Sequence, residues 1–306
     1  MSDLTLRIAG YQGDASVHTR AVRVFADSLV AQLGDRVEIA FTADITREGR
    51  RASELLTMVE GGTLDICYFS SSYLAERVVA LGLFDLPFVV SDRTRIYDRL
   101  AGALGAKLSA DVAEWTGYRV LGFWDNGFRH ISNRLRPIRH PDDCRGMTIR
   151  TLDSALHREV FGAFGFAPVV IDVKNLAEAV ETHQVDAQEN PLTNLYHFGM
   201  HKTHRHVSMT AHFFGVALFL MNRARFDALA AEYRTALREA AEIATAAQRA
   251  FAAAEDETCR ALLEADGVMI VPPEDIDLAA FRRAVAPIVK REIARIGKDT
   301  CAMLGI

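Results

Sequence analysis

The first part of the chain alternates between two hydrophobic patterns. Leu4, Leu6 and Ile8 occupy every second position, which is typical of a half-buried strand. Apolar residues then recur three and four positions apart up to Gly34, which indicates an amphipathic helix closed by a glycine. The two patterns recur as strands predicted at 37–41 and 64–69 and a helix at 54–59. This order predicts βαβ units on a parallel sheet and therefore an α/β fold.

A second series of strands and helices follows a connection rich in proline and arginine, residues 134–145. A strand is predicted at 118–124, just before this connection. The segments after it are predicted to be strands at 147–151, 168–171 and 185–186 and helices at 154–164 and 175–183. The change from one series to the other lies near Asn126.

Residues 222–266 contain neither glycine nor proline and are rich in alanine, leucine and paired charges. At about 1.5 Å per residue, one helix over this segment would exceed the width of a single lobe. Such a helix bends or runs across two lobes, which suggests a ligand binder that closes about a hinge. The alternative is a pair of consecutive helices in one core.

Composition and charge exclude several classes of protein. The chain has 306 residues with a net charge of −5, enough for two lobes and without the basic excess of a nucleic-acid binder. Its longest clean apolar stretch, 213–221, is shorter than a membrane-spanning helix. No basic and apolar leader precedes the first strand, so we expect a cytoplasmic protein or one whose export signal has been removed.

Signatures of catalysis and of metal binding are weak. The chain lacks GxGxxG, GxxxxGK[ST], GxSxG and HExxH, and its four cysteines form no CxxC pair. Five histidines gather late in the chain, at His197, His201, His204, His206 and His212. Two of them are four residues apart and could hold zinc on a helix face, but the neighbouring lysine and arginine oppose a metal. We expect neither a metal nor a cofactor.

Two arginines lie next to predicted strand ends. Arg129 follows the segment 124–128, and Arg150 closes the strand that begins at Met147. A guanidinium matches a carboxylate through two parallel hydrogen bonds, and if buried it needs an anionic partner. Surface ion pairs are the alternative. Asn190, in the polar segment 185–191, could offer its amide to a ligand or simply form a turn.

In order and spacing, these segments resemble the solute-binding proteins of TRAP (tripartite ATP-independent periplasmic) transporters over nearly the whole chain. Residues 124–129 are similar to the family's aromatic-x-Asn-Gly-x-Arg motif, and residues 133–150 to its Asn…Arg-Pro-Ile…Lys-Ile-Arg run. Residues 185–191 are similar to its Val-Asp-Gly-Gln-Glu-Asn-Pro motif, with Ala187 in place of the glycine.

The resemblance implies a two-lobed periplasmic-binding-protein-like fold with a long helix spanning both lobes. Residues 1–126 with 215–254 form lobe I, residues 127–214 with 255–306 form lobe II, and the hinge is expected near Asn126 and Gly215. It further implies a periplasmic protein, with its signal removed, that has no enzymatic activity and binds no nucleic acid. The expected partners are a small organic acid and the membrane subunits of the transporter, and the protein itself is expected to be a monomer.

The resemblance also implies a set of ligand-binding residues. Arg150 anchors the ligand carboxylate, while Arg129 and Asn190 supply further polar contacts. The remaining residues that line the cleft are Tyr11, Ser70, Val173 and Phe214, with His18 at a position where the family often has histidine. The expected pocket is made apolar and aromatic by Tyr11, Tyr68, Phe213 and Phe214, which favours a carboxylate with an aromatic or apolar body. A C4-dicarboxylate or a sugar acid is the alternative, and an enzyme using Asp186 or Glu189 as a base is the rival class.

Overall fold

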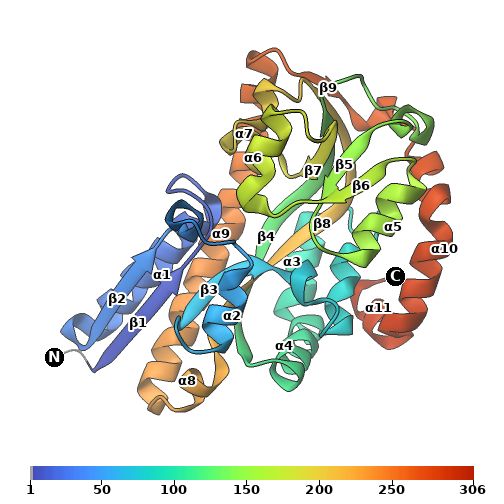
Figure 1. Ribbon diagram of the computed structural model, residues 1–306. Helices are drawn as coiled ribbons and strands as arrows, with labels where there is room; N and C mark the ends of the chain where they lie inside the picture. The colour runs from blue at the N-terminus through green and yellow to red at the C-terminus, as the bar shows by residue number, and fades with distance from the viewer. Residues whose placement is uncertain (1–2) are drawn as a thin grey trace. The chain divides into compact units, whose positions relative to one another are not determined.

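The computed structural model describes residues 3–306, and they form two compact units. The first unit comprises residues up to 71, 100–125 and 216–253, and the second comprises 72–99, 126–215 and 254–306. Strands and helices alternate in both, so the chain has the α/β fold that the hydrophobic patterns predict (Figure 1).

In the first unit, the strands are hydrogen-bonded in the order β2-β1-β3-β8, with β8 antiparallel to β3 and the others parallel. Its strands are β1 (Leu4–Ala9), β2 (Val37–Thr42), β3 (Ile66–Ser70) and the last part of β8 (His206–Asn222). Its helices are α1 (Val17–Leu33), α2 (Glu54–Glu60), α4 (Ala103–Trp115) and α8 (Arg223–Asp227). Leu4, Leu6 and Ile8 are buried, as their alternation predicts. Figure 1 shows α1 lying along β1 and β2.

In the second unit, the strands are hydrogen-bonded in the order β4-β7-β5-β6, and β9 pairs with β8. Its strands are β5 (Thr148–Thr151), β6 (Ala167–Val170), β7 (Ala187–Asn190), β9 (Met269–Val271) and parts of β4 (Tyr118–Asn133) and β8. Its helices are α5 (Ala155–Ala163), α6 (Val173–Glu181), α7 (Leu192–His197), α10 (Leu278–Ile296), α11 (Lys298–Leu304) and most of α3 (Arg93–Ala101). The core holds a cluster of phenylalanines, Phe161, Phe164, Phe213 and Phe281.

Three elements continue from one unit into the other. β4 and β8 have 16 and 17 residues, and α9 (Ala231–Ala265) has 35. Residues 231–253 of α9 belong to the first unit and 254–265 to the second, so this helix runs through both units and not one core. The segment 222–266 is nevertheless two consecutive helices, because the short α8 precedes α9. Within residues 3–306, no helix has both the length and the apolar composition needed to cross a membrane.

Residues 72–99 are placed differently from the predicted lobe division. The sequence analysis assigned them to lobe I, whereas the structure packs them in the second unit. Inside that unit, Asp85 lies 2.9 Å from Nε2 of His157, and the backbone amide of Phe88 donates to the carbonyl of His212. These contacts join segments far apart in sequence, and no local pattern predicts them. The role of the two units as lobes that close on a ligand stays a prediction.

Candidate ligand-binding site

Arg150 is a buried guanidinium on β5, a strand that lies between the parallel strands β6 and β7. Its Nε donates to the carbonyl of Ile171 at 2.7 Å, and it donates a further hydrogen bond to the hydroxyl of Tyr73. Both partners are uncharged. No aspartate or glutamate within residues 3–306 forms an ion pair with Arg150, although its side chain is almost fully enclosed. A buried charge of this kind calls for an anion from outside the chain.

Tyr73 is the site residue that the sequence analysis missed. It lies in a short 3₁₀ turn, Ser71–Leu74, with no motif around it. Burial raises the pKa of Tyr73, although the charges of Arg150 and Arg129 act in the opposite direction. The phenol therefore stays neutral at pH 7 and leaves the positive charge of Arg150 uncompensated.

Arg129 already has an acidic partner inside the protein. Its Nη2 donates to Oε1 of Glu189 at 2.7 Å and to the Glu189 carbonyl at 2.9 Å, and its Nε also contacts Oε2. The pair forms because β4 and β7 are antiparallel neighbours in which Ile131 lies opposite Glu189. The two side chains are 7% and 0% exposed, so this is a buried ion pair. We therefore expect Arg129 to orient a ligand rather than to supply net charge.

Asn190 extends this polar group. Its Oδ1 accepts from Nη2 of Arg129 at 3.2 Å, and its Nδ2 donates to Gln188 at 2.6 Å. Phe214 packs edge-on against Phe128, with ring centroids 5.0 Å apart. Val173 is the first residue of α6 and is partly exposed. These three predicted residues lie in the second unit with Arg150, and their contact with a ligand stays a prediction.

Tyr11, Ser70 and His18 belong to the first unit. The Tyr11 ring lies 5.3 Å from that of Tyr68, which also stacks on His18 at 5.0 Å. Ser70 is the last residue of β3. The structure thus gathers Tyr11 and His18 around one tyrosine, and the role of all three residues in binding also stays a prediction.

The two carboxylates considered as bases are both held in ion pairs. Asp186 lies 2.6 Å from Nη2 of Arg134 and accepts from the backbone amide of Thr148 at 2.9 Å. Burial alone would raise the pKa of Asp186 and of Glu189, but hydrogen bonds and the paired arginines outweigh it and lower both. Carboxylates with lowered pKa values are poor proton acceptors at neutral pH. The arrangement favours binding over catalysis.

The family follows from comparison with known proteins. Residues 8–295 match the family model described as Bacterial extracellular solute-binding protein, family 7. The chain belongs to this family. It is 28% identical over 270 residues to the 2,3-diketo-L-gulonate-binding periplasmic protein YiaO of Escherichia coli strain K12, covering 88% of this chain and 81% of that protein. It is 29% identical over 222 residues to the C4-dicarboxylate-binding periplasmic protein DctP of Rhodobacter capsulatus, covering 72% and 66%.

Solved structures agree with this assignment. A TRAP periplasmic solute binding protein from Polaromonas sp. JS666, bound to D-erythronate, matches with a TM-score of 0.92 and 26% identity over 99% of each chain. The predicted TRAP-type α/β fold is therefore confirmed. Family 7 proteins of this kind bind small organic acids, work with membrane subunits and are not enzymes, as the sequence analysis expected.

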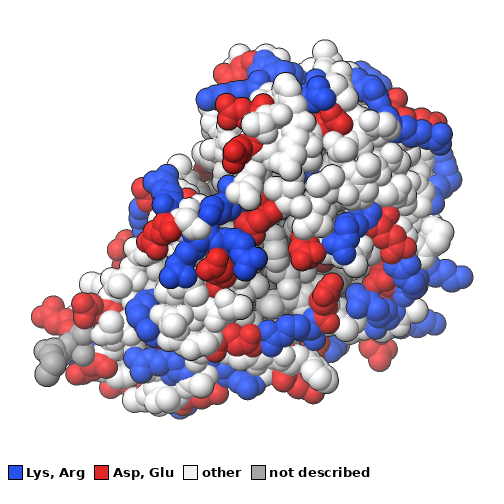
Figure 2. All heavy atoms as spheres, viewed as in Figure 1, with Lys and Arg blue, Asp and Glu red and all other residues white. Residues whose placement is uncertain are grey.

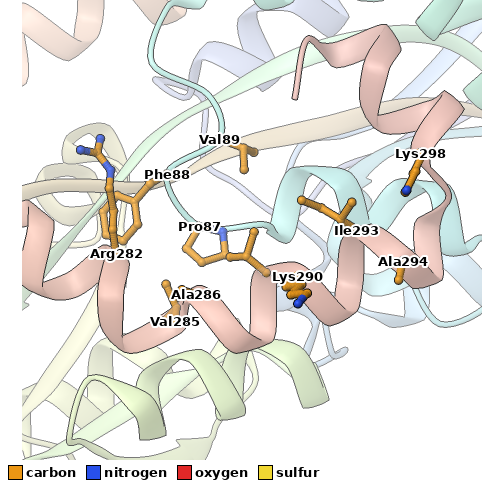
Figure 3. A pocket seen from close by; sticks show the side chains of 11 residues that line it. Pro87, Phe88, Val89, Arg282, Val285, Ala286, Lys290, Ile293, Ala294 and Lys298 are labelled. Atoms are coloured by element: carbon orange, nitrogen blue, oxygen red, sulfur yellow. The ribbon is translucent and has the colours of Figure 1, made fainter.

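An apolar groove also lies on the second unit of this family 7 protein, between α10 and residues 87–89. Figure 3 shows side chains from both segments around the groove, whose volume is about 550 Å³. Arg282 lies over the Phe88 ring at 5.4 Å, and the remaining lining is largely aliphatic. Arg129 and Arg150 lie outside this lining, so we do not assign the groove to acid binding.

The late histidines of this family 7 protein do not share one partner. His201 faces Asp266 at 3.2 Å, and His204 faces Ser132 at 3.1 Å. Nδ1 of His212 forms a hydrogen bond with the hydroxyl of Thr210, and its Nε2 lies 3.5 Å from Oε2 of Glu189. Each of these histidines therefore has its own partner. This does not support the zinc site on one helix face that their spacing suggested.

Gly127, in the motif at residues 124–129, packs closely against Pro191, in the motif at residues 185–191. Its φ is +77°, and a Cβ added there would lie 2.7 Å from Cβ of Pro191. We expect Gly127→Ala to cost at least about 2 kcal/mol in unfolding free energy, because left-handed strain and a steric clash add together. Urea denaturation measures the change. Gly162→Ala on α5 is the control: its added methyl meets open space, so we expect it to stabilise slightly, and equal stability of the two variants would contradict the steric argument.

Buried neutral histidines make the stability of the protein depend on pH. Burial lowers the pKa values of His18, His130 and His204 to about 3. Below about pH 6.5 these histidines bind protons in the unfolded chain but stay neutral in the folded chain. Their contribution to the unfolding free energy is therefore fully present above that pH and falls on acidification. From pH 7.5 to 5 we expect each histidine to remove about 2 kcal/mol. Urea midpoints at both pH values should differ less in His204→Gln than in the wild type, and an unchanged difference would contradict the assignment.

Proposed function

We propose that this protein captures a small organic acid whose carboxylate is held by both terminal nitrogens of Arg150. The observation that carries the proposal is the enclosed guanidinium, which has only a carbonyl and a phenol as partners within the described chain. A planar guanidinium and a carboxylate form two parallel hydrogen bonds, so a bound acid would supply both the charge and the acceptors. Arg129 and Asn190, already fixed by Glu189 and by each other, would orient the rest of the ligand.

The proposed body of the ligand is compact and apolar or aromatic. Tyr11, Val173 and Phe214 are the residues that support this class, and their side chains offer surface rather than charge. A sugar acid is the second candidate, because Tyr73 and Asn190 carry groups that can hydrogen-bond a hydroxyl, and because relatives are named for diketogulonate and D-erythronate. A C4-dicarboxylate would need a second cation beside Arg150, and Arg129 is already neutralised.

The proposed setting is that of the relatives. We propose that the protein works as a monomer outside the cytoplasm, with membrane subunits of a TRAP transporter as its partners, and that its two units act as the lobes that close on the ligand. The net charge of −5 and the interspersed acidic and basic side chains on the face shown in Figure 2 agree with a partner other than nucleic acid.

A thermal-shift screen of ligand-stripped, refolded protein tests the proposal. The panel contains aromatic acids, 2-hydroxy and keto acids, C4-dicarboxylates and sugar acids, each with its neutral amide as a matched control. At about 100 times Kd, linkage gives about 2.7 kcal/mol of stabilisation and a shift of several degrees. We expect one class of acid, but not its amides, to produce this shift. Shifts from amides as large as those from acids, or none from folded protein, would contradict the proposal.

A further inference from the structure

A histidine, a glutamate and a cysteine converge where α7 meets the end of α9. His197 is the last residue of α7, and Glu255 and Cys259 lie one turn apart on α9. The Nε2 atom of His197 lies 2.7 Å from Oε1 of Glu255. One donor atom from each of the three residues lies within 4.8 Å of the other two. The pattern combines an i, i+4 pair on one helix with a third donor from another.

These donors fit one class of cation. Imidazole nitrogen, carboxylate oxygen and thiolate sulfur together suit a borderline-soft divalent metal such as zinc, which binds them at about 2.0 to 2.3 Å. Tetrahedral bonds of that length place donor atoms about 3.3 to 3.8 Å apart. The His197–Glu255 separation of 2.7 Å is shorter than this range, so that pair must open slightly. The other donor separations do not exceed 4.8 Å, so they need to close by no more than about 1 Å.

The three residues differ in how deeply their side chains are buried. The Cys259 side chain is held in the apolar cluster that also contains Leu192, Leu195 and Leu263. The side chains of His197 and Glu255 are 31% and 17% exposed, so a fourth position would be open to water. The neighbouring Asp256 is paired with Arg93 at 2.9 Å, which keeps that carboxylate out of the set.

We propose that His197, Glu255 and Cys259 form a binding site for a divalent cation of the zinc class, with water as the fourth ligand. In the metal-free protein, Nε2 of His197 contacts Oε1 of Glu255. A metal would displace the proton of the Cys259 thiol and replace this contact, as metals do at thiol ligands. The bound ion would tie α7, which directly follows the Glu189–Asn190 segment, to α9.

Cobalt(II) titration of chelator-treated protein tests the site, because cobalt reports a thiolate ligand through an intense charge-transfer band in the near ultraviolet. We expect one equivalent of cobalt to produce this band and zinc to remove it by displacement. Cys259→Ser should abolish the band, whereas Cys301→Ser, at another buried cysteine, should keep it. His197 is more exposed than Cys259, so the His197→Gln variant should fold normally. It should weaken cobalt binding by at least about tenfold.

Two results would overturn the proposal. Cobalt binding without a thiolate band would mean only an adventitious ion at surface carboxylates. A band that persists in Cys259→Ser would place the ion at another cysteine. If Cys259→Ser fails to fold, the loss of affinity in His197→Gln decides the question alone. The test is independent of acid binding, since Arg150→Ala should bind cobalt as the wild type does.

Discussion

Replacing Arg150 by alanine is expected to abolish acid binding while leaving the free protein folded. The ligand carboxylate would lose both of its parallel hydrogen bonds and its counter-charge, a loss of about 3 kcal/mol or at least ~100-fold in Kd. The unfolding free energy of the ligand-free protein should stay within about 1 kcal/mol of the wild type, because relief of a buried, unpaired charge offsets the lost packing of the side-chain stem. Calorimetric titration and urea denaturation measure the two quantities.

Two further variants make the Arg150 experiment specific. Arg150→Lys keeps the charge but cannot form the planar pair of hydrogen bonds, so it should also bind poorly. Arg145→Ala removes an arginine whose side chain is 77% exposed, and it should bind as the wild type does. Normal affinity in Arg150→Ala would mean that another group anchors the carboxylate.

Glu189→Gln is expected to destabilise the protein by about 3 to 5 kcal/mol. The substitution removes the carboxylate that balances Arg129, and breaking a buried ion pair leaves an uncompensated buried charge. Burial alone would raise the pKa of Glu189, but the charge and hydrogen bonds of Arg129 and the hydrogen bond of His212 outweigh it and lower that pKa. The carboxylate is therefore ionised at neutral pH, and the full penalty applies there. Urea denaturation at pH 7.5 gives the change in unfolding free energy.

A double variant separates charge from packing at this pair. Arg129→Met combined with Glu189→Gln removes both charges, and we expect it to be more stable than Glu189→Gln alone. Asp153→Asn is the matched control, because its ion pair with Arg158 is exposed and should contribute less than about 1 kcal/mol. If Glu189→Gln costs no more than Asp153→Asn, the buried pair does not have the role assigned to it.

The elements with a clear hydrophobic period could be predicted from the sequence. The strand containing Leu4 and the helix ending at Gly34 were found because one face of each packs in the core, which imposes period 2 or 3.6. The same reasoning predicts that β4 ends at Trp124, whereas the strand continues to Asn133. Asp125, Asn126 and Arg129 are polar and buried, so the alternation disappears where the strand enters the site.

The candidate site was predictable only in part. Motif resemblance singled out Arg150 and Arg129, but whether each has an acidic partner depends on which strands are neighbours. The pairing of β4 with β7 brings Glu189 to Arg129 and so removes its net charge, a result of tertiary structure. Tyr73 could not be predicted, because its segment joins the second unit through contacts distant in sequence.

A crystal structure of the protein with the acid identified by the thermal-shift screen tests the central claim most directly. The account predicts a ligand carboxylate facing Arg150, with both oxygens within hydrogen-bonding distance of its terminal nitrogens and the Arg129–Glu189 pair intact. A carboxylate bound to Arg129 instead, with Glu189 displaced, would contradict the assignment of the anchor. A ligand bound without any contact to Arg150 would contradict the proposed mechanism as a whole.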